Sequence, residues 1–193
     1  EALQILAKEA GVQLQNRGPV DRTAKSSQIS AMEDAQSFFR AELLRAKHAL
    51  DYCEGRQITP EILSEWELGF SPNEGTALTV FLQKKGHGLR LCKELFLVDT
   101  DASGGFYDKF RGRLMFPIRD ERGELVAFGG RVIGSDEPKY INSSDTPLYR
   151  KSKVLYGLHK SRDAVYKARH AVLVEGYLDV IACHQAGVNT AVA

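Results

Sequence analysis

The amino-acid sequence predicts an α+β protein: a mixed helical and β basic subdomain, followed by the first β-α-β part of an α/β fold. Three observations lead to this prediction. Apolar residues recur at helical spacing over residues 30–94. Two strand-like runs joined by a hairpin loop follow over residues 114–128. A strand, a sharp turn and a helix then occupy residues 171–186.

The first 29 residues are predicted to lie outside the main subdomain. Residues 1–14 carry apolar side chains such as Leu3 and Leu6 at helical spacing. Residues 15–29 are polar, contain Gly-Pro and show no periodicity, which predicts a linker. We therefore expect the first helix to belong to a preceding domain. The chain begins with Glu1 and not with Met, which we interpret as the start of a fragment.

A long helix is expected to begin at Ser30, which forms a capping box with Glu33. The residues that follow place Phe39 and Leu43 on one helical face. The same apolar spacing continues for several turns, so we expect this helix to end near Tyr52.

Three shorter helices are expected next. Thr59 is a typical N-cap and Pro60 a typical first helical residue, and Gly69 is expected to stop the helix that they begin. The periodicity predicts another helix over residues 76–85, closed by a glycine, and a short one over residues 89–94.

Two strands are predicted at residues 114–118 and 125–128, connected by a hairpin loop at residues 120–123. Pro117 lacks a backbone N–H, which predicts an edge or a bulge at that point. An irregular stretch is expected from Gly129 onward, with residues 139–142 in a loop.

The C-terminal stretch is the most informative part of the chain. A helix over residues 161–167 precedes an apolar run, Val172–Val174, that predicts a buried strand. Glu175 and Gly176 follow, and a helix is expected over residues 177–186. A carboxylate at the C-terminal end of such a strand lies where open α/β sheets bind ligands, and glycine allows a sharp turn. We expect the site that begins here to be incomplete within this chain.

Glu175 is the sharpest candidate for chemistry, because a carboxylate at a strand end can hold Mg²⁺ or act as a general acid or base. Asp179 lies one helical turn further on and can face the same space. The alternative is that Glu175 caps the following helix or pairs with Arg169. Two acidic residues make half of a metal site.

Basic residues are concentrated in the second half of the chain. The net charge is only +1, but residues 104–160 contain 11 Lys and Arg against 7 Asp and Glu, a balance of +4. Residues 30–100 contain 8 against 11, a balance of −3. This asymmetry predicts one surface that faces a polyanion; an ordinary solvated surface of mixed charge is the alternative.

Arginine and lysine side chains gather around the predicted strands, together with aromatic residues on which bases can stack. We expect alternation along the first strand to present parallel guanidinium groups on one face. Phe116 and Phe128 are expected in the core, whereas Tyr140 and Asn142 are expected to contact a ligand. The basic residues are Arg111, Arg113, Arg119, Arg131, Lys139, Arg150, Lys151 and Lys153.

Other common sites are not apparent from the sequence. The five histidines and three cysteines show no metal-ligand spacing and no disulfide framework, as expected for reduced thiols of a cytosolic protein. No P-loop or nucleophile elbow is present. The apolar runs are too short to span a membrane, and no secretory signal is recognisable.

Three segments together resemble the catalytic core of bacterial DnaG-type primases. They are residues 107–132, residues 138–158 and the short motif VEGYLDV at residues 174–180, and they occur in the family's order. Residues 38–70 show a weaker similarity. The resemblance covers residues 30–193.

The resemblance implies a domain organisation. Residues 1–14 are similar to the last helix of the family's zinc-binding domain, whose Zn²⁺ ligands are absent here, and the linker predicted at residues 15–29 would follow it. Residues 30–168 resemble the basic N-terminal subdomain of the catalytic core. Residues 169–193 resemble the start of an incomplete TOPRIM domain.

The resemblance also implies roles for single residues. Glu175 matches the catalytic acid, and Glu175 with Asp179 would hold Mg²⁺ or Mn²⁺. The family's other carboxylates, an Asp-x-Asp pair among them, are expected beyond Ala193. Arg131, Lys139, Tyr140, Asn142 and Lys151 match positions that contact nucleic acid or nucleotide, to which we add Arg56 and Arg113, and also Arg111 and Lys153 from the charge cluster.

The implied function is that of a DNA primase, which synthesises short RNA primers from ribonucleoside triphosphates on a single-stranded DNA template during replication. The expected partners are the template, the RNA primer and a replicative helicase bound through a C-terminal domain absent here. We expect no membrane association, a cytoplasmic location at the bacterial replisome, and a monomeric fragment that lacks full activity.

Two alternatives stay open. The chain can be a nucleic-acid-binding fragment of another TOPRIM protein, of topoisomerase or repair type, or a purely structural domain. If about five basic residues touch single-stranded phosphates, binding should weaken with salt at a log–log slope of about −3.5.

Overall fold

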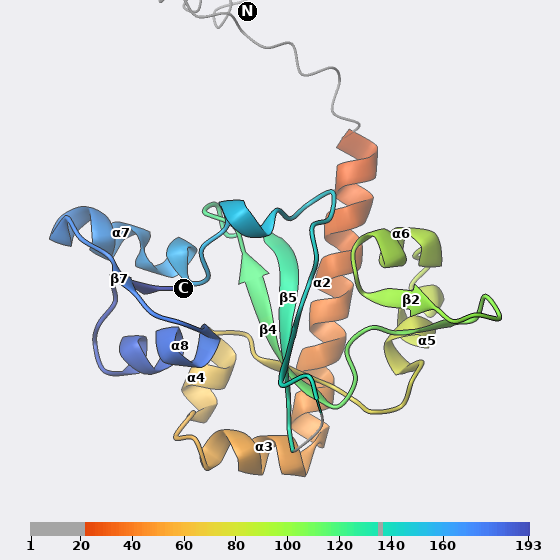
Figure 1. The fold of residues 1–193 in the computed structure, drawn as a ribbon, viewed down its shortest axis with the longest axis horizontal. Coiled ribbons are helices and arrows are strands. Elements are labelled where there is room, and N and C mark those ends of the chain that lie inside the picture. The colour runs from red at the N-terminus through yellow and green to blue at the C-terminus, as the bar shows by residue number, and fades with distance from the viewer. Residues whose placement is uncertain (1–21, 135–136) are drawn as a thin grey trace, which may run out of the picture.

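Helices cover both faces of a central antiparallel sheet in the computed structural model, which describes residues 22–134 and 137–193 (Figure 1). The strand order is β1-β4-β5-β6. This arrangement confirms the predicted α+β class. The strands of this sheet are β1 (Gly69–Ser71), β4 (Arg113–Arg119), β5 (Leu125–Val132) and β6 (Tyr140–Asn142).

The long first helix differs from the expectation at both ends. Helix α2 (Arg22–Arg45) already includes residues 22–29, so the linker prediction and the predicted start at Ser30 are wrong there. A helix extends at little cost once formed, because each added residue brings one further hydrogen bond. The chain then breaks at Ala46 and resumes as α3 (Lys47–Glu54). The helix expected in residues 1–14 lies outside the described residues.

The three shorter helices lie where the sequence predicts them. They are α4 (Pro60–Glu65), α5 (Ala77–Lys84) and α6 (Leu89–Glu94). The Thr59 hydroxyl accepts a hydrogen bond from the Ile62 amide at 3.4 Å, as an N-cap does. The helix that begins at Pro60 ends at Glu65, and Gly69 opens strand β1, so the prediction that Gly69 stops this helix is wrong.

A second, two-stranded sheet is fastened to α5 by a buried carboxylate. It consists of β2 (Val98–Thr100) and β3 (Phe106–Asp108). Asp108 is fully buried and accepts hydrogen bonds from the amides of Leu78 and Thr79 at 2.8 and 2.7 Å. These amides belong to the first turn of α5, where backbone donors have no partner within the helix.

The β4–β5 hairpin confirms the predicted strands and their loop. Gly123 has a φ of +84°, which a residue with a side chain rarely adopts. Pro117 lies past the last residue of β4 that pairs with β1, one residue before a register shift at Ile118/Arg119. The predicted irregular stretch from Gly129 is wrong, because β5 continues to Val132 and pairs with β6, where a loop was expected.

Two apolar cores lie on opposite faces of the sheet. The core on one face joins Met115 and Phe128 to α2, α5 and α6. The core on the other face joins Leu114 and Phe116 to α3, α4 and the C-terminal unit. Phe116 and Phe128 are both fully buried, which confirms their predicted place in the core.

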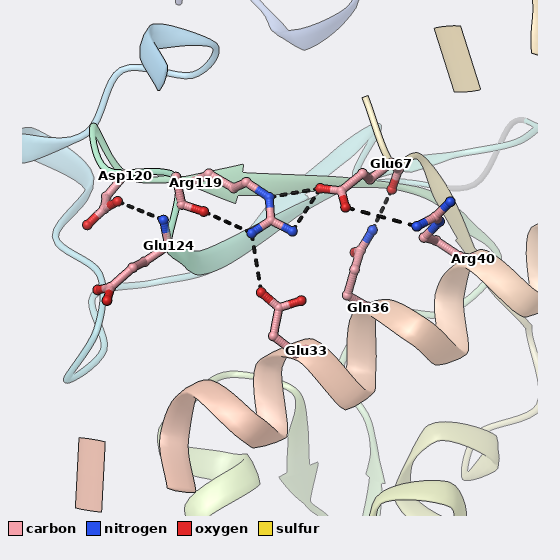
Figure 2. Close-up of polar contacts among 8 residues, drawn as sticks. Glu33, Gln36, Arg40, Glu67, Arg119, Asp120 and Glu124 are labelled. Carbon is pink, nitrogen blue, oxygen red and sulfur yellow. Dashed lines mark hydrogen bonds and ion pairs between the residues drawn. The ribbon is translucent and has the colours of Figure 1, made fainter. Parts of the chain in front are cut away.

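The guanidinium of Arg119 ties three elements together (Figure 2). Its Nε donates to Oε2 of Glu67 at 2.8 Å, and one terminal nitrogen donates both to Oε1 of Glu33 at 3.2 Å and to the carbonyl oxygen of Gly123 at 2.9 Å. The amide of Gln36 donates to the Glu67 carbonyl at 2.5 Å. The network links α2, the turn after α4 and the hairpin, so Arg119 is occupied by carboxylates.

The C-terminal residues form the predicted β-α-β unit. Helix α7 (Leu158–Ala168) precedes β7 (Val172–Leu173), α8 (Tyr177–Gln185) and β8 (Ala191–Val192), and β7 pairs with β8 in parallel. The expectation of a buried strand is wrong, because Leu173 is 74% exposed. Within the described residues β7 pairs with β8 alone, so its other edge and outer face are uncovered. No described helix is long and apolar enough to cross a membrane.

Candidate functional site

A cleft of about 710 Å³ lies where the C-terminal unit meets the central sheet. Its walls come from β5, β6, the 3₁₀ helix at Lys151–Lys153 and the turn between β7 and α8. Residues far apart in the sequence therefore meet in one place. Eight of the residues predicted from the sequence line it: Arg56, Arg131, Lys139, Tyr140, Asn142, Lys151, Glu175 and Asp179.

The register of the sheet explains why several of these side chains share one face. Arg131 lies directly opposite Tyr140 across β5 and β6, and Gly129 lies opposite Asn142. Side chains two residues apart on a strand point to the same side, and directly opposed residues do so as well. The side chains of Tyr140 and Asn142 therefore lie on the same face of the sheet as that of Arg131.

The two carboxylates stand at the turn between β7 and α8. Glu175 follows the strand, and Asp179 lies in the first turn of α8; both are exposed. Among the described residues, none forms an ion pair or a side-chain hydrogen bond with either carboxylate. Arg169 instead stacks on the ring of Tyr166 at 5.3 Å, and α8 has no side-chain cap. The structure therefore contradicts both alternatives for Glu175.

Hydrogen bonds hold the backbones of Lys139 and Lys151 in place. The Lys139 amide donates to a Glu137 carboxylate oxygen at 3.0 Å, and its carbonyl accepts from Val132 at 3.0 Å. The Lys151 amide donates to Asp145 at 2.9 Å. Within the described part of the chain, neither ammonium group has a hydrogen bond or an ion pair. Both charges are available to an anion in the cleft.

Arg131 is held by its cross-strand neighbour. One terminal nitrogen donates to the Tyr140 hydroxyl at 2.7 Å, and the guanidinium lies 5.3 Å from the centre of the same ring. Its Nε is buried and has no hydrogen-bond partner among the described residues. A buried donor without a partner is costly, so this guanidinium has unused capacity for an acceptor.

Tyr177 connects the C-terminal unit to the sheet. Its ring stacks on Phe116 with centroids 5.2 Å apart, over the space left by Gly129. Its hydroxyl donates to Oδ1 of Asn142 at 2.8 Å. Burial raises the pKa of Tyr177 well above its ordinary value, so the hydroxyl remains a donor. The side-chain amide of Asn142 then offers its NH₂ group to the cleft.

Three predicted residues do not reach the cleft. Arg113 is only 4% exposed and donates to the carbonyls of Gly130 and Lys139 at 3.5 and 3.4 Å. It lies on the opposite face from Arg131, because Arg131 pairs with the neighbouring Leu114. Arg111 is exposed and stacks on Tyr107, and Lys153 is exposed outside the cleft. Arg111 lies outside β4, Arg113 is buried and Arg119 is paired with Glu67, so the expected row of parallel guanidinium groups is wrong.

One tyrosine of the cleft, Tyr177, was missed by sequence reasoning, whereas Tyr149 and Tyr156 belong to the aromatic residues expected among the basic ones. Tyr177 follows the Glu-Gly pair directly, and this position next to the candidate acid is a signal that could have identified it. Tyr149 and Tyr156 also line the cleft. Both are buried, which raises the pKa of each, and no local pattern distinguishes them from core residues.

The donor set of the cleft fits part of a magnesium site. The described residues contain no group of three or more His, Cys, Asp or Glu that could hold a metal ion. Glu175 and Asp179 nevertheless line the same cleft, and neither carboxylate has a hydrogen bond or an ion pair with another described residue. One or two carboxylates, completed by water and substrate phosphates, are the usual ligands of Mg²⁺. The two residues are therefore compatible with that ion.

Known proteins share this sequence and fold. Residues 38–162 match the family described as "DNA primase catalytic core, N-terminal domain". A DNA primase from Halalkalibacterium halodurans is 42% identical over 202 residues, which cover all of this chain and 33% of that protein. The chain thus spans about a third of the length of the curated relatives that it matches.

Solved structures agree with the sequence match. One is the RNA polymerase domain of Mycobacterium tuberculosis primase DnaG, in complex with a double-stranded DNA oligomer with a 6-nucleotide overhang. It matches this chain with a TM-score of 0.82 and 36% sequence identity, and the match covers 87% of this chain and 54% of the tuberculosis chain. A DnaG primase catalytic domain bound to single-stranded DNA has a TM-score of 0.81 and 34% identity, with coverages of 90% and 56%.

Proposed function

Because this chain belongs to the family of bacterial DnaG-type DNA primases, we propose that its full-length protein synthesises short RNA primers on single-stranded DNA during replication. The chain contributes the basic part of the catalytic core and the first unit of the TOPRIM domain. Relatives bound to single-stranded DNA and to DNA with an overhang support a DNA template as the partner.

One observation carries this proposal: charges of both signs, none of which forms an ion pair with another residue of the described ranges, line a single cleft. Arg56, Arg131, Lys139 and Lys151 supply the positive charges, and Glu175 and Asp179 the negative ones. A purely structural domain would neutralise such charges or leave them scattered over its surface. A site for nucleotide polymerisation needs cations for phosphates and carboxylates for a metal ion in the same space.

The residues divide the work by their chemistry. In nucleotidyl transfer a hydroxyl oxygen of the primer attacks the α-phosphorus of the incoming ribonucleotide, and pyrophosphate leaves. The lysines and arginines would bind and orient the phosphates, and the amide NH₂ of Asn142 would donate to an oxygen of the ligand. Glu175 and Asp179 would hold Mg²⁺ or Mn²⁺, which neutralises phosphate charge when bound.

Three further parts of the proposal come from the family alone. Zn²⁺ would belong to the family's zinc-binding domain, whose last helix is similar to residues 1–14. The replicative helicase would bind through a C-terminal domain, and the site of action would be the bacterial replisome.

Primer synthesis by lysine variants of the full-length protein tests the function. Lys139→Ala and Lys151→Ala should each reduce primer synthesis at least about 10-fold, since one charge-assisted hydrogen bond is worth about 1.5 to 3 kcal/mol. Lys84→Ala is the matched control, because Lys84 is an exposed lysine of α5 outside the cleft. Full activity in both cleft variants would contradict the proposal.

The same variants separate a primase from a DNA-binding fragment of another TOPRIM protein. A pure binder would lose affinity for single-stranded DNA in these variants and show no dependence on nucleotides. If all four cations of the cleft reach template phosphates, the log–log slope of affinity against salt should approach about −2.8. Binding that does not change with salt would exclude phosphate contacts in this cleft.

A further inference from the structure

Tyr52, which sequence analysis did not single out, contacts the two arginines of the cleft through its ring. The guanidinium of Arg56 lies 5.0 Å from the centre of its ring, and that of Arg131 lies 5.8 Å away. Arg56 follows the end of α3, whereas Arg131 belongs to β5. One aromatic ring therefore contacts two like charges from distant parts of the sequence.

The contacts of Tyr52 indicate an indirect role. Both arginines line the cleft, whereas Tyr52 lines only an adjoining open pocket that it shares with Arg56. Its hydroxyl is buried without a hydrogen-bond partner among the described residues, so this group does not reach a ligand. The ring is half-buried and packs against the core that contains α3 and α4.

The physical consequence is pre-organisation of positive charge. Two guanidinium groups repel each other, and each arginine side chain must lose rotamer freedom when it binds a phosphate. The negative face of an aromatic ring attracts both cations and offsets part of that cost. Arg131 has a second support in Tyr140, whereas Tyr52 is the ring contact of Arg56 within the described residues.

We propose that Tyr52 is a positioning residue of the cleft, which holds Arg56 and Arg131 ready for a phosphate-bearing ligand. This inference rests on the proposed function of the cleft. The aromatic ring carries the effect, and the hydroxyl does not.

Two substitutions of Tyr52 in the full-length protein separate the ring from the hydroxyl. Tyr52→Leu keeps an apolar side chain but removes the aromatic ring; it should weaken binding of ATP and of a fluorescein-labelled single-stranded DNA oligonucleotide about 5- to 30-fold, or about 1 to 2 kcal/mol. Tyr52→Phe keeps the ring and should bind within about 2-fold of the wild type. Equal losses in both variants, or no loss in Tyr52→Leu, would overturn the inference.

A double-mutant cycle tests whether Tyr52 acts through the arginines. In an Arg56→Ala/Arg131→Ala background, Tyr52→Leu should have almost no further effect on binding. An undiminished effect there would show that Tyr52 acts by another route and would sink the proposal. Urea unfolding of each variant distinguishes lost positioning from lost stability.

The outcomes also separate this inference from the function on which it rests. If the arginine substitutions weaken binding and Tyr52→Leu does not, only the positioning role fails. If neither arginine substitution weakens binding, the proposed function of the cleft and the role of Tyr52 fail together.

Discussion

Replacement of Gly129 by alanine should destabilise the protein and disturb the candidate site. Gly129 lies in β5, and the ring of Tyr177 packs directly against it. A Cβ at this position would overlap Cε2 of Tyr177 and lie 2.7 Å from its Cζ, so the ring must move. The same ring stacks on Phe116 and carries the hydroxyl that holds Asn142.

The size of the effect follows from three terms. Overpacking of a well-packed core costs about 1 to 3 kcal/mol, and the lost Tyr177–Asn142 hydrogen bond adds about 0.5 to 1.5 kcal/mol. Removal of a glycine from a strand returns about 0.5 to 1 kcal/mol. The net loss in the free energy of unfolding should lie near about 2 kcal/mol. Displacement of Tyr177 also moves the start of α8, so primer synthesis should fall.

Urea denaturation and primer synthesis measure the two effects. Gly75→Ala is the matched control, because no atom lies within 4 Å of a Cβ at Gly75 and its φ is not positive. Gly129→Ala combined with Tyr177→Leu, which gives the methyl group room, should cost less than the sum of the two single changes. Equal stability of Gly129→Ala and Gly75→Ala would refute the reasoning.

Two further predictions concern stability. Arg119→Met should lower the free energy of unfolding by about 2 kcal/mol, because it leaves the partly buried Glu67 without its main partner. Arg40→Met is the control, because the exposed ion pair between Arg40 and Glu67 spans 4.0 Å. Its loss should cost less than about 0.5 kcal/mol in the same urea titration. Burial lowers the pKa of His159 from 6.5 to about 4. Between these two pH values the unfolded state binds more protons than the folded state, so the free energy of unfolding should fall as the pH falls from 6.5 to about 4. Urea titrations at several pH values should show a loss of about 1 to 2 kcal/mol after allowance for the partial exposure of His159, and an unchanged pH dependence in His159→Gln would disprove this assignment.

Local signals in the sequence predicted much of the fold. The cap at Thr59, the helices of α5 and α6 and the hairpin at Gly123 depend on interactions within a few residues, and all were found. The errors concern features that distant contacts decide. Residues 22–29 carry no strong helix signal, yet they continue α2. Residues 129–132 contain two glycines, yet they remain in β5 because β4 and β6 pair with them.

The candidate site shows the same division. Glu175 could be identified because an apolar run, an acid and a glycine are adjacent in the sequence. Tyr52 could not be identified, because its importance comes from two arginines that approach it from other elements. Arg113 was expected to contact the ligand, but its side chain lies on the face of the sheet opposite to Arg131. The register between β4 and β5 decides which side chains share a face, and the sequence of one strand does not specify that register.

The sequence by itself determined which residue types were present, where helices and turns could start, and which acid followed the C-terminal strand. Only the tertiary structure decided which charges share a cleft and which are neutralised, as Arg119 is by Glu67. The physical reason is that propensities and turns act over a few residues, whereas a cleft is built by strand register and by packing between segments far apart in the chain.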